Sequence, residues 1–274
     1  MNFFERISKG MEITRSSFEV LGKNKELLIF PILSGISMLL IMASLFAGVL
    51  GWAGWNIDNI PEPSRGLTYV FVFIYYVINY FVVVFFNMAL VHCTRLYFEG
   101  DEVTVRKGLE FSMSRIGAIF SWALLAATVG TILKAIQENA GIVGKLITGL
   151  IGLVWNVATF FVVPILAYEK VGPVDAVKRS AAIMKDKWGE SLGSGFGMGI
   201  ISFLAALCII AVAVGLSFIS PWIGIPAGVL ALLLLSVIMS AAQTVFVSTV
   251  YQQVTGNTTH HIHEKLLEGL FVRK

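Results

Sequence analysis

Three side chains near the C-terminus have the types and the spacing of metal ligands. His260 and His263 are three residues apart, and His260 and Glu264 are four apart. On a helix these three would share one face, and imidazole and carboxylate groups bind transition metals such as zinc. A solvated or interfacial tail accounts for the same residues without a metal, and one cluster without further ligands favours that interpretation. We therefore expect no metal and no cofactor.

Neutral polar residues lie within three of the apolar stretches of the chain at helical spacing. They are Tyr76, Asn79, Tyr80 and Asn87 in one stretch, Asn156 and Thr159 in a second, and Ser240, Gln243 and Thr244 in a third. Hydrogen bonds between helices are their simpler role. The alternative is that they line a cavity for a lipid, an amphiphile or a small polar solute. This alternative requires the three stretches to face one another.

Charged side chains are absent from the centre of every apolar stretch. Such residues usually mark proton relays, ion pathways and catalysis within a membrane. The chain also lacks a pair of intramembrane aspartates and a His-Glu-x-x-His motif. We expect the protein not to be an enzyme, and a transporter that couples ions through carboxylates is disfavoured.

The elements that would position these residues are six long apolar stretches. The chain of 274 residues is 57% hydrophobic and 14% charged, whereas soluble domains have about 25% charged residues. A membrane-spanning helix needs about 20 apolar residues. The candidates are residues 28–50, 67–91, 116–133, 146–168, 192–218 and 222–250. We predict an all-α, polytopic membrane protein with six transmembrane helices, in which residues 1–274 form a single integral membrane domain.

The basic residues are sorted between the two sides of these spans. Seventeen of the 20 Lys and Arg residues fall on the side that holds both termini, and three fall on the other. The positive-inside rule therefore predicts a multi-pass protein of the cytoplasmic (inner) membrane with cytoplasmic N- and C-termini. The net charge is only +3, so we expect no nucleic-acid partner.

The predicted cytoplasmic segments are amphipathic. In residues 1–27 the apolar positions at helical spacing are Phe4, Ile7, Met11, Phe18 and Leu21. This spacing predicts a helix that lies in the membrane interface or packs under the bundle. Similar basic segments precede the third span (105–115) and the fifth (177–188), and residues 251–274 form the predicted cytoplasmic tail. The pattern suggests three repeated helical hairpins about a pseudo-threefold axis. Alternatively, any six-span protein carries basic amphipathic segments on its inner side.

The connection between the fourth and fifth spans contains breakers and cations. Pro164 is expected to bend the fourth span, and Gly172 followed by Pro173 is expected to separate two helices. The cations that follow are Lys178, Arg179, Lys185 and Lys187. We expect them to contact lipid headgroups. A docking surface for a cytoplasmic partner is the alternative.

Residues 161–173, 176–180, 187–190 and 251–256 carry a family resemblance. They resemble an uncharacterised prokaryotic family of six-span integral membrane proteins, a domain of unknown function. More distantly, they are similar to the membrane domain attached to some glycerophosphodiester phosphodiesterases. The resemblance implies a six-span architecture and supplies no catalytic residue.

The function that we expect is a non-catalytic membrane protein that organises lipid or partner proteins. The alternative is a transporter or channel for a neutral or amphipathic small molecule or lipid. The expected partners are membrane lipids, with a homo-oligomer or a membrane-protein partner left open.

Overall fold

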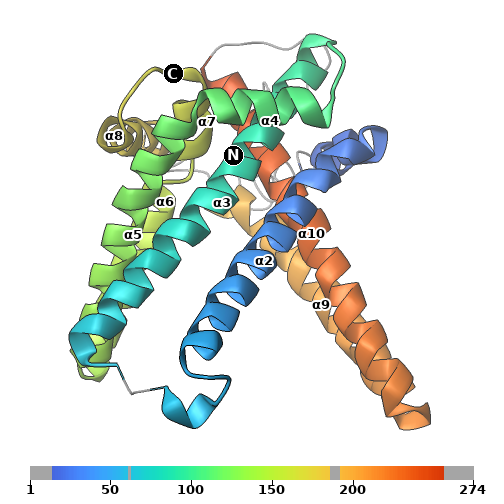
Figure 1. Ribbon diagram of the computed structural model, residues 1–274. Helices are drawn as coiled ribbons and strands as arrows, with labels where there is room; N and C mark the ends of the chain where they lie inside the picture. The colour runs from blue at the N-terminus through green and yellow to red at the C-terminus, as the bar shows by residue number, and fades with distance from the viewer. Residues whose placement is uncertain (1–13, 61–62, 186–191, 256–274) are drawn as a thin grey trace. The chain divides into compact units, whose positions relative to one another are not determined.

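The computed structural model describes residues 14–60, 63–185 and 192–255 (Figure 1). Within these ranges the chain forms helices and no strands. Six helical segments are long and apolar enough to cross a membrane: Lys25–Trp52, Arg65–Glu99, Ile116–Asn139, Ile142–Tyr168, Ile201–Ile219 and Pro221–Gln252. The predicted all-α fold with six membrane-spanning helices is therefore confirmed.

The helices of the described chain follow one another with short connections. After a helix over residues 14–23 come η1 (Lys25–Leu28), α2 (Ile29–Trp52), η2 (Ile57–Asn59), α3 (Arg65–Glu99), α4 (Val105–Ser114), α5 (Ile116–Asn139), α6 (Ile142–Ala158), α7 (Val162–Tyr168), α8 (Pro173–Ile183), α9 (Leu192–Ile219) and α10 (Pro221–Val254). α8 begins at Pro173, as its sequence predicts, because proline has no N–H to leave unpaired in a first turn.

Helix α3 extends eight residues beyond the apolar stretch that ends at Val91. Its last turns carry an ion pair of 2.6 Å between Arg95 Nε and Glu99 Oε1 at i, i+4, a spacing that stabilises helices. Gly100 then adopts a φ of +80°. The N–H of Asp101 donates to the Leu96 carbonyl at 2.9 Å, which closes the helix with the hydrogen bond of a Schellman motif.

The chain divides into two compact units, each assembled from separate parts of the sequence. Unit 1 comprises residues 1–31, 90–107 and 182–274, and unit 2 comprises residues 32–89 and 108–181. Since both units draw on distant segments, the division does not correspond to two consecutive domains. The single-domain prediction stays a prediction.

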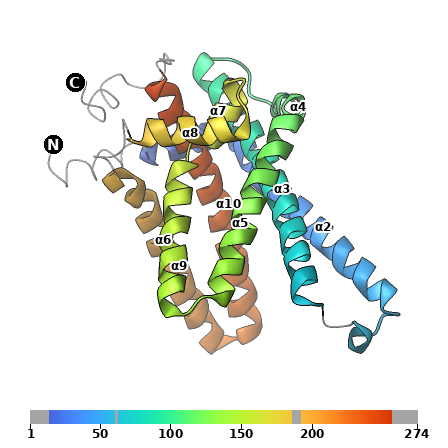
Figure 2. The ribbon, with the colours of Figure 1, turned by 90° about the vertical axis from the view of Figure 1, so that its left-hand side faces the viewer.

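In unit 2, helices α5 and α6 form an antiparallel pair (Figure 2). The indole rings of Trp122 and Trp155 stack between them, with centroids 6.0 Å apart and planes 8° from parallel. Helix α3 packs against α5 at Gly130, where a Cβ atom would lie 3.2 Å from the ring of Tyr76. The absence of a side chain at Gly130 therefore lets an aromatic ring lie directly on the α5 backbone.

The fourth span of the sequence consists of two helices with a break between them. Helix α6 ends at Ala158, residues 159–161 form turns, and α7 begins at Val162. Pro164 falls in the first turn of α7, where its missing N–H leaves no hydrogen bond unmade. In a continuous helix its ring would clash with the preceding turn. The bend predicted at Pro164 is thus confirmed as a helix break.

In unit 1, α9 and α10 form a helical hairpin linked by Ser220. Small residues bring the two backbones close together. A Cβ atom on Gly228 would lie 2.6 Å from the Cβ of Ala213, and one on Gly224 would overlap the backbone of Ser217. Close approach through small residues is a common way to pair helices in a membrane.

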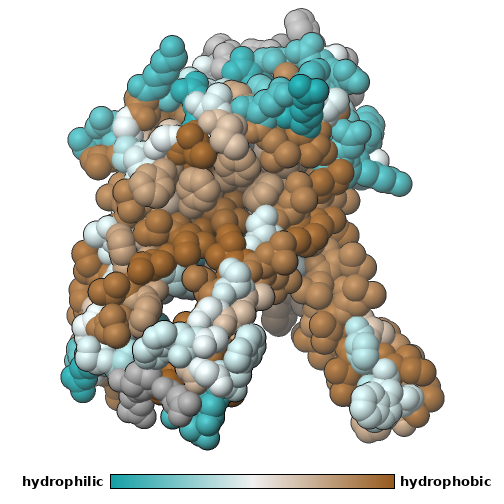
Figure 3. All heavy atoms as spheres, in the orientation of Figure 1, coloured by the Kyte–Doolittle hydropathy of each residue, from teal (hydrophilic) through white to brown (hydrophobic). Residues whose placement is uncertain are grey.

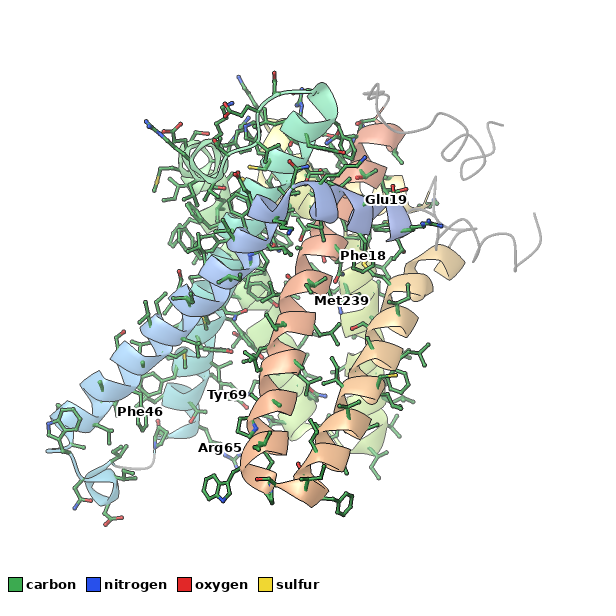
Figure 4. All side chains as sticks on the ribbon, turned by 90° about the vertical axis from the view of Figure 1, so that its right-hand side faces the viewer. Phe18, Glu19, Phe46, Arg65, Tyr69 and Met239 are labelled. Atoms are coloured by element: carbon green, nitrogen blue, oxygen red, sulfur yellow. The ribbon has the colours of Figure 1, made fainter. Side chains whose placement is uncertain are left out.

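Residues 14–23 and η1 belong to the same unit, and η1 packs against α10. Figure 4 shows residues 14–23 lying crosswise to α10, with Phe18 on the side where Met239 lies and Glu19 on the other side. The face that this helix buries contains Thr14, Ser17, Val20 and Leu21. Phe18 is half-buried, and the predicted positions Phe4, Ile7 and Met11 lie outside the described residues.

The buried core of unit 2 gathers where α4 and α8 lie. Met88, Ile119, Phe161, Ile165 and Ala176 are fully buried there. At the opposite ends of the spans Trp52 is 75% exposed and Ile142 is 90% exposed. Figure 3 shows an apolar band over α2 and α3, with hydrophilic residues over α4 and around the α2–α3 connection. This distribution suits helices whose outer faces contact lipid.

Candidate functional site

Two short helices, α4 and α8, have most of their residues in unit 2 and carry several of the basic residues of the chain. In Figure 1 α4 lies crosswise to α3 and α5, and in Figure 2 α8 lies crosswise to α5 and α6. Each helix immediately precedes a membrane-spanning helix in the sequence. We name the outward-facing side of α4 and α8 the crosswise-helix surface.

A buried serine holds each of these helices in place. The Ser112 hydroxyl of α4 donates to the Phe85 carbonyl of α3 at 2.8 Å. The Ser180 hydroxyl of α8 accepts a hydrogen bond of 3.0 Å from the backbone N–H of Phe161. Both serines are fully buried. Each bond therefore joins a crosswise helix to a spanning segment within unit 2.

The cations of α8 lie beside acidic side chains. Lys178 Nζ is 3.3 Å from Asp175 Oδ1, and Arg179 Nε is 3.4 Å from Glu169 Oε1. Lys178 and Arg179 are both exposed, as is Lys185, and Lys187 lies outside the described residues. Exposed ion pairs of this kind contribute about 0–1 kcal/mol to stability. Their carboxylates partly neutralise the cations that were predicted to contact headgroups.

A second group of side chains links α4 to the end of α7. The Arg115 guanidinium lies over the Phe111 ring, 5.9 Å from its centroid. The Phe111 ring is 6.1 Å from that of Tyr168, which ends α7. Arg115 is the single residue between α4 and α5. Among the described residues it makes no ion pair.

The predicted polar residues of the second span lie on α3 in unit 2. Tyr76 and Tyr80 are neighbours, with ring centroids 6.2 Å apart. The Asn79 amide nitrogen is 3.9 Å from the thioether sulfur of Met38 on α2. Asn87 is half-buried. Tyr76 and Tyr80 therefore contact one another, and Asn79 contacts a neighbouring helix of the same unit.

In the fourth span, the Thr159 hydroxyl donates to the Trp155 carbonyl of its own helix at 2.8 Å, and Asn156 is exposed. In the sixth span, Ser240 and Gln243 are exposed, and the Thr244 hydroxyl donates to the Ser240 carbonyl at 3.1 Å. The polar residues named in the second and fourth spans belong to unit 2, and these α10 residues belong to unit 1. A cavity lined by all three spans stays a prediction.

The proposed metal ligands His260, His263 and Glu264 lie outside the described residues. In the part of the chain that the structure describes, no group of three or more His, Cys, Asp or Glu residues is arranged to hold a metal. The tail cluster therefore stays a prediction.

Sequence reasoning missed the residues that position the crosswise helices. Ser112, Ser180 and Arg115 were not among the predicted site residues. A signal was present, because each basic segment contains a small residue between its cations, and Ser17, Ser112 and Ser180 are all buried. The predicted repeat of three helical hairpins stays a prediction, and so does its threefold arrangement.

The crosswise helices, the broken fourth span and the α9–α10 hairpin all fall within one region of sequence similarity. A search of curated proteins finds no match to the chain. A family model matches residues 66–260, which is more than half of the protein. The chain belongs to a family of unknown function, DUF6159.

Proposed function

We propose that the protein is a non-catalytic integral membrane protein that organises anionic lipid, and partner proteins drawn to it, at the cytoplasmic face of the cell membrane. The observation that carries this proposal is the crosswise-helix surface. Two amphipathic helices are pinned to the apolar core by Ser112 and Ser180 and expose their cations. A Lys or Arg near an anionic membrane surface contributes about 1 kcal/mol of attraction.

The sorting of charge supports this orientation. The side with 17 basic residues includes α4, α8 and both termini, and such a bias favours a cytoplasmic location for that side. A phosphatase or a fluorescent reporter fused after Lys274 tests the orientation. We expect activity only for the reporter that functions in the cytoplasm, and a periplasmic signal would contradict the proposal.

The ion pair between Asp175 and Lys178 on α8 allows a test in which two substitutions are expected to change lipid enrichment in opposite directions. The full-length protein is extracted with its surrounding lipid in polymer-bounded particles, and the anionic fraction of that lipid is compared with that of the whole membrane. We expect Lys178→Gln with Arg179→Gln to lower the enrichment of anionic lipid by at least about twofold, because two attractions are lost. Asp175→Asn is expected to raise it, since Lys178 loses its neutralising neighbour.

A matched control is available at the other ends of the spans. Lys134→Gln with Lys145→Gln removes the same charge from the α5–α6 hairpin, where the positive-inside rule predicts the opposite membrane surface. We expect this pair to leave the enrichment unchanged when Lys178 and Arg179 are intact. An equal loss in both double variants, or no enrichment in the wild-type protein, would contradict the proposal.

Transport of a neutral or amphipathic small molecule or lipid is the second candidate. It is supported by the exposure of Asn156, Ser240 and Gln243 within apolar helices, because exposed polar groups are costly in hydrocarbon. Water-soluble maleimides that label Asn156→Cys and Gln243→Cys in intact membranes, with Cys208→Ser as background, would support it. Protection of both cysteines would argue against a wet pathway.

We propose that the distant likeness to the membrane domains of some glycerophosphodiester phosphodiesterases extends to architecture alone. The segment from Pro164 to Ser180 that carries the likeness has a structural role here, because it forms the helix break and the α8 anchor. Nothing in this segment supplies the constellation of a hydrolase.

A further inference from the structure

We propose that the junction of α4 and α5 binds one anionic phospholipid, with its phosphate at Arg115 and an acyl chain along α5. This inference rests on the proposed function and names its ligand. The site is distinct from the α8 cations, since Lys178 and Arg179 already lie beside Asp175 and Glu169. Arg115 has no acidic partner among the described residues.

The backbone of Arg115 is held by hydrogen bonding, and its guanidinium contacts one aromatic ring. Helix α4 ends at Ser114 and α5 begins at Ile116, so Arg115 occupies a one-residue corner. Its N–H donates to the Ser112 carbonyl at 3.0 Å, and the Ser112 side chain is bound to Phe85. The guanidinium lies over the Phe111 ring, 5.9 Å from its centroid. A pre-oriented arginine loses little entropy when it binds a phosphate through two nitrogens.

An exposed apolar stripe starts directly beside this cation. Ile116, Phe120 and Leu124 are spaced four residues apart on α5 and are 42%, 50% and 37% exposed. From the first to the last the helix rises about 12 Å, which is a large part of one leaflet of a bilayer with a core of about 30 Å. Phe120 is held from one side by an edge contact to Phe81 at 6.4 Å.

The combination selects an amphiphile with a negative headgroup. Arg115 attracts an anion, and the stripe accommodates a hydrocarbon chain. The stripe begins at Ile116, the residue that follows Arg115. Helix α4 lies crosswise to α5 (Figure 1), as expected for a helix in the headgroup layer. A soluble anion would leave the stripe unused, and a zwitterionic lipid would offer Arg115 a weaker partner.

Native mass spectrometry of the delipidated full-length protein tests the site. Phosphatidylglycerol and phosphatidylethanolamine with identical acyl chains are titrated separately. For Arg115→Gln we expect the dissociation constant of the first phosphatidylglycerol to rise about tenfold, as for loss of a charge-assisted hydrogen bond. Arg115→Lys keeps the charge, and its affinity for phosphatidylglycerol is expected to fall less than that of Arg115→Gln. Phe120→Ala is expected to weaken both lipids.

Arg65→Gln is the matched control, because Arg65 is an exposed arginine at the start of a span in the same unit. It is expected to leave the dissociation constant within about twofold of the wild-type value, the scatter of surface substitutions. Equal affinities of wild type and Arg115→Gln, or an equal loss in Arg65→Gln, would overturn the site. Displacement of the lipid by millimolar glycerol phosphate would also overturn it, because the ligand would then be a soluble anion.

The outcomes separate this inference from the proposed function. If Arg115→Gln binds phosphatidylglycerol normally while the Lys178→Gln, Arg179→Gln variant loses anionic enrichment, this site fails and the proposed function stands. If the wild-type protein does not distinguish the two lipids, both fail. Melting temperatures of every variant in detergent identify any that are misfolded, and Arg115→Lys provides the charge-retaining replacement in that event.

Discussion

The Ser180 hydroxyl accepts a hydrogen bond of 3.0 Å from the backbone N–H of Phe161, nineteen residues earlier in the chain. Both residues are fully buried. Phe161 caps α7, directly after the break that separates it from α6, so its N–H lies outside the regular hydrogen bonding of either helix. Ser180 thereby accepts the hydrogen bond of a backbone N–H at the break in the fourth span, and this bond fixes α8 against α7.

Replacement of Ser180 by alanine is expected to lower the free energy of unfolding by about 1–3 kcal/mol, because a buried N–H loses its acceptor. Thermal unfolding in detergent measures the change. Ser236→Ala is the control, since the Ser236 hydroxyl is exposed and bonds only to the Leu233 carbonyl of its own helix. Equal melting temperatures for the Ser180→Ala and wild-type proteins would show that the bond does not contribute.

Ser112→Ala is expected to lower the free energy of unfolding by about 0.5–1.5 kcal/mol, which is less than the loss expected for Ser180→Ala. The Ser112 hydroxyl donates to the Phe85 carbonyl, which lies inside α3. A carbonyl oxygen has two lone pairs, and this one retains its helical hydrogen bond when the serine is removed. The same unfolding assay compares the two alanine variants. A larger loss for Ser112→Ala than for Ser180→Ala would contradict this account of the two anchors.

Gly228→Ala is expected to destabilise the α9–α10 hairpin by about 1–3 kcal/mol, the usual cost of overpacking. The new methyl group would lie 2.6 Å from the Cβ of Ala213, and the two helices must separate to admit it. Gly152→Ala is the matched control within a helix, because a Cβ there would meet nothing within 4 Å. It is expected to be neutral or to stabilise the protein by up to about 1 kcal/mol. Similar effects at the two positions would refute the close packing.

Asn79→Leu distinguishes the two roles of the polar residues in the second span. The Asn79 amide approaches the Met38 sulfur at 3.9 Å, a weak interaction, and polar contacts between membrane helices average about 0.6 kcal/mol. We expect the melting temperature in detergent to change little and anionic-lipid enrichment to be retained. Loss of solute flux in reconstituted vesicles, with the melting temperature unchanged, would instead support a cavity.

Several elements could be predicted from the sequence because they depend on neighbouring residues. The six apolar stretches follow from transfer free energies summed over about 20 residues. The break before Pro164 and the start of α8 at Pro173 follow from the covalent geometry of proline. The extension of α3 to Glu99 was not predicted, since its last turns depend on an ion pair and a glycine cap rather than on hydropathy.

The buried faces of the short helices were harder to predict. Hydropathy placed Phe18 on the apolar face of the first helix, yet Thr14 and Ser17 are buried and Phe18 is half-buried. Small hydroxyl residues let helices approach closely, and a transfer scale counts them only as polar. For the same reason, Ser112 and Ser180 were not recognised as anchors.

The sequence by itself determined that the chain is an all-α membrane protein, where its spans run and on which side its cations gather, because hydropathy and charge are properties of each residue and add along the chain. The tertiary structure alone decided which buried hydroxyl meets which backbone group. It also decided which cations are neutralised by acidic neighbours and that Arg115 lies beside the apolar stripe of α5. These relationships join residues distant in sequence, such as Ser180 and Phe161, and they exist only once the helices have packed.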